Sequence, residues 1–215
     1  SGINVVIEYP VLASYTPMDT YSPLTMDNIQ LEFSVAMDID LISNISLSSA
    51  LFGNIAYTQS GTTSSFNLAF SQSMASLDTI TLTLPESLQS SYGYGFDGNA
   101  DGPPGNSQTI TLYLETLADY DHNEAIEFDD LTTFITAWYA DDYSKELGPF
   151  TGNVPHLIPE LDSSFAFEDI AAFILMWNWS HDFTTRMARI EEVGTPTTFT
   201  IANDILSLDL SVFEE

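Results

Sequence analysis

IEFDDLTTFITAW, residues 126–138, can be laid without a gap on FAFEDIAAFILMW, residues 165–177. In both copies an acidic residue, Asp130 or Asp169, is followed by apolar residues at i, i+3, i+4 and i+7 spacing. This spacing places side chains on one face of an α-helix. The matched apolar residues are Leu131, Phe134, Ile135 and Trp138 in the first copy and Ile170, Phe173, Ile174 and Trp177 in the second. The sequence therefore predicts an internal duplication of a loop–helix unit.

The twelve residues that lead into the first predicted helix, DYDHNEAIEFDD at 119–130, carry oxygen donors at regular intervals. Calcium takes 6–8 oxygen ligands, and loops of this length place them at positions 1, 3, 5, 7, 9 and 12. Glu124 stands at position 6 in place of the usual glycine, so a non-glycine residue has to adopt a left-handed conformation at a cost of about 1 kcal/mol. Asp130 replaces the longer Glu at position 12. We expect calcium here, and an acidic turn that caps the helix without an ion is the alternative.

The duplicated loop–helix units resemble the dockerin-like repeats of bacterial surface proteins over residues 118–180. The resemblance rests on an Asp at position 12, a helix after each loop, the Asp-Leu and Asp-Ile junctions, and the aromatic helix faces. It implies calcium ligation by six residues of the first loop, which are Asp119, Asp121, Asn123, Ala125 through its carbonyl, Glu127 and Asp130.

The second loop, placed in the same register, covers residues 158–169 and predicts a weaker site. Its oxygen donors are Glu160, Asp162, Ser164 and Asp169. Ile158 at position 1 and Ala166 at position 9 have no side-chain oxygen, so the sequence leaves open whether an ion binds here.

A third acidic loop, DGNADG at residues 97–102, places Asp97, Asn99 and Asp101 at alternate positions. The two prolines that follow it prevent a helix from continuing. The pattern fits either a plain turn between strands or a calcium loop that clamps the N-terminal part to the helical unit.

Residues 1–117 are typical of β-structure. Strict alternation of apolar and polar residues in TITLTL at 79–84 and TITLYL at 109–114 predicts strands with one buried face. Further short strands are predicted at residues 3–9, 29–35, 45–47 and 66–70, separated by clusters of turn residues. Such spacing, without helical periodicity, predicts an antiparallel β-sandwich.

YTPMD at 15–19, IQLEFS at 29–34, Met37-Asp38 and a late TITL strand resemble a bacterial Ig-like surface domain. That resemblance implies an Ig-like β-sandwich that serves as a spacer or adhesive scaffold and carries no chemistry of its own.

Three regions are expected along the chain: the Ig-like β-sandwich at 1–117, the dockerin-like module at 118–182, and a tail at 183–215 that ends in β-strand. Strand-like alternation returns in the tail at residues 197–201 and 205–213. A tail strand could close its own sandwich, begin a following domain, or add to the sheet of a neighbouring subunit.

Composition excludes several classes of partner and chemistry. Thirty-one acidic residues against three basic ones give a formal net charge of −28, whereas nucleic acids and anionic lipids require basic patches. No apolar run reaches the roughly 20 residues of a membrane span. Cysteine is absent, and the three histidines have no zinc-binding spacing. Without a hydrolase or phosphate-loop motif, the sequence predicts a protein that is not an enzyme.

These expectations combine into a secreted module, extracellular or at the cell surface, with a structural or assembly role. Calcium would stabilise it, and strand addition would let it polymerise with itself or join another surface protein. One alternative is a docking module whose duplicated helices anchor a cohesin-like partner, through exposed residues near the helix starts such as Thr132, Thr133, Ala171 and Ala172. Another is a carbohydrate-binding adhesin that uses Trp179, Tyr92 and Tyr94 as stacking platforms.

Overall fold

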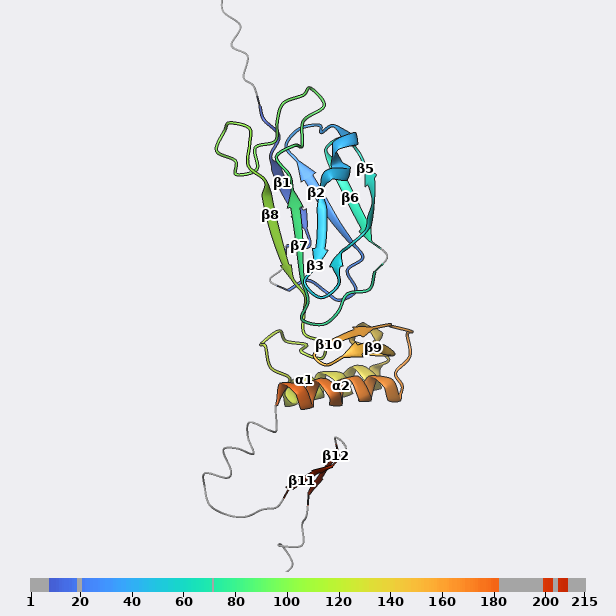
Figure 1. Ribbon diagram of the computed structural model, residues 1–215. Helices are drawn as coiled ribbons and strands as arrows, with labels where there is room; N and C mark the ends of the chain where they lie inside the picture. Colours follow the sequence, from blue (N-terminus) through green and yellow to red (C-terminus); the bar gives the residue numbers. More distant parts are fainter. Residues whose placement is uncertain (1–7, 19–20, 71, 182–198, 203–204, 209–215) are drawn as a thin grey trace, which may run out of the picture.

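The computed structural model describes residues 8–18, 21–70, 72–181, 199–202 and 205–208. A β-structured part lies at the N-terminal end, a pair of helices follows, and a separate strand pair lies near the C-terminus (Figure 1). The fold is mainly antiparallel β with few helices, which confirms the predicted class at that level.

The β-structured part consists of two four-stranded antiparallel sheets. The first sheet has the order β1-β2-β6-β5, with β1 at Leu12–Thr16, β2 at Asn28–Phe33, β6 at Ser65–Phe70 and β5 at Tyr57–Gly61. The second has the order β4-β3-β7-β8, with β4 at Gly53–Asn54, β3 at Ser46–Ser49, β7 at Thr79–Leu84 and β8 at Gln108–Tyr113. A short 3-10 helix, η1 at Ile39–Asn44, leads into β3.

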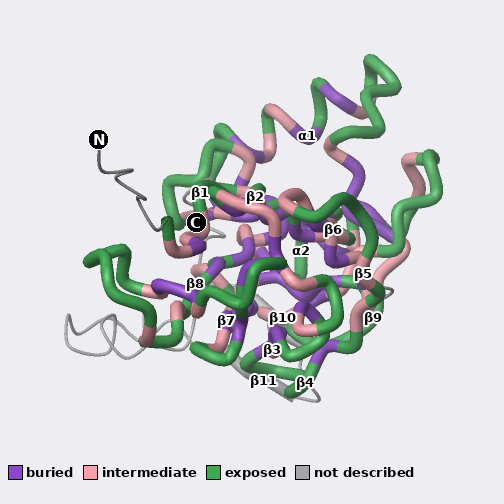
Figure 2. Tube along the Cα trace, turned by 90° about the horizontal axis from the view of Figure 1, so that it is seen from above, coloured by how far each residue is buried: buried purple, intermediate pink, exposed green. Residues whose placement is uncertain are grey.

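Alternation along the strands places the core between the two sheets. Every second residue of β2, β6 and β7 is buried, and Figure 2 shows buried positions toward the middle of the molecule and exposed ones around them. The buried side chains of both sheets form one apolar cluster, within which Phe33 packs edge-to-face on Phe66 at 6.0 Å between ring centroids. Leu31, Leu68 and Leu82 in this cluster are fully buried.

Most of the predicted strands are present, and the differences have physical reasons. β7 has the bounds predicted from TITLTL, and β8 is displaced by one residue. The strand predicted at residues 3–9 lies largely outside the described residues; its last two positions are not in a strand, and β1 begins at Leu12 instead. The sequence missed β5 because this edge strand, YTQSG, is polar and mostly exposed.

A helix is present at each predicted place. α1 spans Phe128–Ala140 and α2 spans Phe167–Ser180, so both begin at equivalent positions of the duplicated unit. The equivalent residues Phe134 and Phe173 stack on each other at 5.4 Å with an interplanar angle of 18°. In the described part of the chain, no helix has the length and apolar character needed to cross a membrane.

Each helix begins where an aspartate folds back onto the preceding loop. The Asp130 carboxylate accepts the amide of Glu127 at 2.8 Å, and the Asp169 carboxylate accepts the amide of Ala166 at 2.7 Å. These bonds satisfy amides that a helix start leaves free. Between the helices lie η2 at Tyr143–Lys145 and a hairpin of β9 at Phe150–Asn153 and β10 at His156–Pro159, which the sequence did not predict.

The helical module is tied to the sheets through Ser76, a fully buried residue just before β7. Its amide donates to the carbonyl of Leu157 at 2.8 Å, and its hydroxyl accepts the amide of Leu117 at 2.9 Å. The Ser76 carbonyl lies 2.9 Å from Nδ1 of His156. One serine therefore joins the sheets to both the connecting segment and the hairpin.

Near the C-terminus, β11 at Phe199–Ala202 pairs antiparallel with β12 at Ile205–Leu208. These strands confirm part of the strand content predicted for the tail, while residues 182–198, 203–204 and 209–215 lie outside the described residues. In the described part of the chain the two strands form a sheet of their own and join neither four-stranded sheet.

We predict that Ser76→Ala lowers the free energy of unfolding by about 1–3 kcal/mol, because the buried amide of Leu117 loses its acceptor. Urea denaturation followed by tryptophan fluorescence measures this loss. Ser73→Ala, an exposed serine three residues away, is the control and should change stability by less than about 0.5 kcal/mol. Equal losses in the two variants would contradict the role assigned to Ser76.

Candidate metal centre

Three carboxylates of the first loop lie together at the start of α1. Oxygen atoms of Asp119, Asp121 and Asp130 all lie within 4.8 Å of one another. Asp119 and Asp130 are buried, at 5% and 1% exposure, whereas Asp121 is exposed. The structure thus brings together three of the six ligands that the sequence predicts.

Hydrogen bonds from the backbone hold the two buried carboxylates in place. Asp119 accepts the amide of Asn123 at 3.2 Å and the amide of Glu124 at 3.0 Å. Asp130 accepts the amide of Tyr120 at 2.7 Å, in addition to its bond from Glu127. The loop therefore closes around its own acidic groups, because Asp119 binds the middle of the loop and Asp130 joins its start to its second half.

Two non-glycine residues of this loop adopt left-handed backbone conformations. His122 has a φ of 57° and Glu124 a φ of 69°. The conformation expected at Glu124, where a glycine is usual, is therefore present. The backbone strain at these positions is offset by the bonds to Asp119, because the turn aims two consecutive amides at one carboxylate.

Burial raises the pKa of the Asp119 carboxyl above its ordinary value. The two backbone amides act in the opposite direction, and the nearby charges of Asp130 and Asp121 add to the rise. The charged form of Asp119 is thus disfavoured, as expected where a carboxylate is taken out of water beside others of the same sign. A cation among the three carboxylates would relieve this cost.

The chemistry of the donors suits a hard cation. All of them are carboxylate or carbonyl oxygens, which favour calcium or magnesium over thiolate-binding metals. The side-chain oxygen of Asn123 accepts a hydrogen bond from the backbone amide of Ala125 at 2.9 Å. Its side-chain NH2 group donates to the Asp121 carboxylate at 3.0 Å. Glu127 is exposed and does not belong to the acidic cluster, whereas Asn123 and Ala125 lie on the same loop and stay predicted ligands.

A residue from the N-terminal part also reaches this loop. The Tyr21 hydroxyl donates to the Glu124 carboxylate at 2.6 Å, and its ring stacks on His122 at 6.1 Å between centroids. Sequence reasoning missed Tyr21 because it lies about a hundred residues before the loop. This contact links the loop to the sheets.

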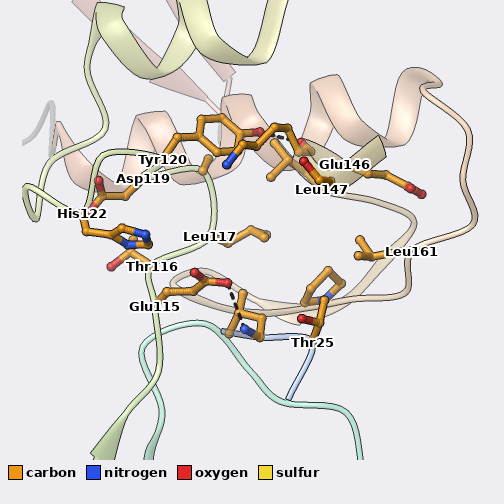
Figure 3. A pocket seen from close by; sticks show the side chains of 15 residues that line it. Thr25, Glu115, Thr116, Leu117, Asp119, Tyr120, His122, Glu146, Leu147 and Leu161 are labelled. Carbon is orange, nitrogen blue, oxygen red and sulfur yellow. Dashed lines mark hydrogen bonds between the residues drawn. The ribbon is translucent and has the colours of Figure 1, made fainter. Parts of the chain in front are cut away.

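A small cavity lies beside the loop, where the sheets meet the helical module. Figure 3 shows Glu115, Asp119, His122 and Glu146 around it, contributed by both parts of the chain. Glu115 accepts the amide of Leu24 at 2.9 Å on the sheet side of this cavity. The cavity volume is about 100 Å³, below the range of about 300–1,000 Å³ that is usual for pockets holding organic ligands.

The second loop is organised by Glu146, which sequence reasoning did not select. The Glu146 carboxylate is buried and accepts the amides of Asp162 and Ser163. Asp169 accepts the amides of Leu147 at 2.9 Å and Gly148 at 3.0 Å, besides that of Ala166.

This arrangement repeats the first loop position by position. Glu146 binds two consecutive amides as Asp119 does, and Asp169 binds the amide after Glu146 as Asp130 binds the amide after Asp119. Ser163 has a φ of 61°, like Glu124 at the equivalent position. The hairpin β9–β10 is inserted within the loop, between its first residues and the rest.

The start that the sequence assigned to this loop was wrong for that reason. A continuous register places position 1 at Ile158, but Ile158 lies in β10 and Glu146 occupies the equivalent place. Burial raises the pKa of Glu146, its two amides lower it, and the neighbouring Asp162 carboxyl adds to the rise. Of the other predicted ligands, Glu160 and Ser164 are exposed, and ion binding at this loop stays a prediction.

In the third loop, too, a buried carboxylate accepts two consecutive backbone amides. Asp97 is buried and accepts the amide of Asp101 at 3.2 Å and the amide of Gly102 at 2.8 Å, while Asn99 donates to Asp101. The loop cannot clamp the sheets to the helical module as expected. It precedes the first residue of β8, which pairs with Leu84, whereas the module follows the opposite end of β8 (Figure 1).

Some of the residues expected to stack on a sugar or to contact a partner protein are exposed, and others are buried or hydrogen-bonded. Tyr92 is 85% exposed, and Tyr94 and Trp179 are each 39% exposed, so they remain candidates for stacking on a sugar. Ala172 was wrongly expected to be exposed at a docking surface; it is fully buried because it faces the core. Thr132 directs its hydroxyl back to the Phe128 carbonyl at 2.8 Å.

We predict that Glu146→Ala lowers the free energy of unfolding by about 1–3 kcal/mol, because the amides of Asp162 and Ser163 lose their acceptor. Denaturation in the presence of a chelator measures the effect without any contribution from bound ions. Glu160→Ala is the matched control, since it removes an exposed carboxylate of the same loop and should cost less than about 0.5 kcal/mol. A larger loss for Glu160→Ala would restore the loop start at Ile158.

Comparisons with known proteins assign no family to this chain: no family of known sequences matches it, and no curated protein does. Among solved structures it is similar to the N-terminal part of the bacterial S-layer protein SbsC, with a TM-score of 0.36, 12% identity and coverage of 50% of this chain and 24% of that one. Domains 1–6 of surface layer protein SbsC give a TM-score of 0.34, 12% identity and coverage of 50% and 14%. Recombinant SbsC gives 0.32, 13% identity and coverage of 49% and 13%. The chain spans about a quarter or less of these proteins, and TM-scores this low do not define a shared fold.

Proposed function

We propose that this chain is a non-enzymatic structural and assembly module of an extracellular, cell-surface protein or filament, and that calcium stabilises it. The observation that carries the proposal is the acidic cluster of the first loop, whose Asp119 lines the cavity between the sheets and the helical module (Figure 3). A cation at a junction fixes how two parts of a molecule sit together, which is a mechanical role.

Asp119, Asp121 and Asp130 would hold the ion, with Asn123, the Ala125 carbonyl and Glu127 as further ligands from the same loop. When bound, calcium supplies the positive charge that these carboxylates lack. Tyr21 and Glu124 transmit the order of the loop to the sheets, because their hydrogen bond joins the two parts.

The strand order supports an Ig-like assignment for the first region. An Ig sandwich has strands A-B-E-D in one sheet and C-F-G in the other, with C′ added beside C in some members. The orders β1-β2-β6-β5 and β4-β3-β7-β8 match A-B-E-D and C′-C-F-G when the strands are lettered along the chain. Such sandwiches serve as spacers and adhesive scaffolds on many unrelated surfaces, so the fold supports a structural role without specifying a partner.

The strand pair β11–β12 is the part suited to joining modules. In the described part of the chain neither strand pairs with a third one, so both strand edges offer main-chain hydrogen-bonding groups. We infer that this pair supplies strands to a sheet other than those of its own copy, which is the geometry of strand addition.

The exposed face of the helices favours a second candidate function, a docking module for a partner protein. Ile135 and Ile174 occupy equivalent positions and are 45% and 51% exposed, and Phe128 and Phe167 are 73% and 76% exposed. An apolar patch of this kind is typical of a protein interface. Capture of a cohesin-like domain that is lost on chelation, and lost in Ile135→Asp, would favour docking over assembly.

For calcium, we predict that chelation lowers the melting temperature and loosens the helical module first. Calcium at a hundred times its dissociation constant should add about 2.7 kcal/mol to the free energy of unfolding. Differential scanning calorimetry with EDTA or calcium measures the shift. Asp119→Asn should abolish it, while Asp129→Asn, which changes a neighbouring acid outside the cluster, should retain it. Identical melting curves in EDTA and calcium would refute the proposed site.

For assembly, we predict that deleting residues 195–215 abolishes polymerisation and leaves the sheets and helices folded. The reason is that the described parts at 8–181 form their sheets and helices without the tail strands. Electron microscopy and sedimentation of the full and truncated chains, in calcium, measure assembly, and circular dichroism confirms folding. Filaments of unchanged length from the truncated chain would rule out the role of the tail.

A further inference from the structure

The sequence of the last strand repeats that of β2. DILSLDLSVFEE, residues 204–215, can be laid on DNIQLEFSVAMD, residues 27–38, without a gap. The identical pairs are Asp204 and Asp27, Leu208 and Leu31, Ser211 and Ser34, and Val212 and Val35. Leucines stand opposite Ile29 and Phe33, and acidic residues stand opposite Glu32 and Asp38.

The repeat preserves the pattern that places β2 in the core. Ile29, Leu31 and Phe33 are the buried residues of β2, and the residues at the three equivalent positions are Leu206, Leu208 and Leu210. The strands also begin at the same place in the alignment, because β2 starts at Asn28 and β12 at Ile205.

The partner strands match in register as well. In the first sheet Leu31 pairs with Tyr15 and Gln30 pairs with Thr16. In the tail the equivalent residues Leu208 and Ser207 pair with Phe199 and Thr200. In both strand pairs, therefore, the residue opposite the leucine is aromatic, and the residue that follows it in the chain is a threonine. The sequence repeat and the strand pairing therefore agree on one alignment.

We propose that β11 and β12 are the first two strands of a second sandwich of the same kind, and that the helical module connects the two sandwiches. This inference rests on the proposed assembly role, since it names the partner of the strand pair. An isolated two-stranded hairpin is marginally stable in water, so a strand with an apolar face requires further strands to cover it.

The partner that β12 fits is a strand with the pattern of β6. In the first sandwich β2 lies between β1 and β6, where Ile29 pairs with Leu68 and Leu31 pairs with Phe66. The β6 strand of this chain already lies between β2 and β5, so neither of its edges is open in any copy. The β6 strand of another copy therefore cannot cover β12, and a second sandwich requires a further strand with the pattern of β6.

The test extends the chain so that β12 gains the partner strands that β2 has in the first sandwich. Because Glu215 is equivalent to Asp38, a copy of residues 39–117 is appended directly after Glu215 of the full chain. The extension should slow hydrogen exchange at the amides of residues 205–210 by on the order of 100-fold relative to the unextended chain. Exchange at Ile29–Phe33 in the same sample reports that the first sandwich is folded. Unchanged exchange at 205–210 would overturn the proposal.

Two substitutions in the extended chain separate core formation from unspecific contact. Leu208→Asp should abolish the protection, because Leu208 takes the place of the buried Leu31. Ser207→Asp should retain it, because Ser207 takes the place of the exposed Gln30. Equal effects of both substitutions would also overturn the proposal.

A second experiment places the tail sequence in the first sandwich and does not depend on the folding of the extended chain. Replacing residues 28–35 of the first sandwich by residues 205–212 should leave a cooperative unfolding transition, whereas the same insert shifted by one residue should abolish it. Loss of the transition in both chimeras would count against the proposal. Loss of assembly on deleting the tail, together with failure of both tests, would leave the assembly role intact and refute the second sandwich alone.

Discussion

A buried carboxylate that accepts two consecutive backbone amides is the interaction on which the loops of this chain depend. Asp97, Asp119 and Glu146 all make it, each in a loop where the chain has to reverse direction. Burying a carboxylate costs free energy unless the group is hydrogen-bonded, and two amides offset only part of that cost. The part of the burial cost that the amides do not offset raises the pKa of Asp119 and of Glu146, and the charges of neighbouring carboxylates add to the rise. A cation at either loop would relieve this cost.

Hydrogen bonds between carboxylates and backbone amides also determine the structure of the helical module. In each half, one acidic residue at the loop start and one at the helix start accept hydrogen bonds from the backbone amides of the loop. The hairpin β9–β10 lengthens the second loop, and these hydrogen bonds are still present. The first loop then meets the sheets through Tyr21, and the hairpin meets them through Ser76. The junction is therefore built from hydrogen bonds that the loops themselves position.

The sequence predicts what is encoded locally and misses what depends on distant segments. TITLTL gives β7 because alternation is a property of neighbouring residues, and Asp130 and Asp169 mark the helix starts because their partners lie three residues away. Glu146 was missed because an insertion separates it from the amides that it binds. The polar edge strand β5 was missed because its pairing with β6, and not its own composition, makes it a strand.

Charge limits how such modules can join one another. With 31 acidic and 3 basic residues, two copies repel, and neither offers a basic surface to complement the other. Contacts between modules must then use groups without charge, or ions that bridge like charges. Main-chain hydrogen bonds at the edges of β11 and β12 meet the first condition, as does the apolar helix face around Ile135 and Ile174. Calcium at the proposed site would meet the second, and by neutralising the first loop it would also lower the repulsion that any contact between modules has to overcome.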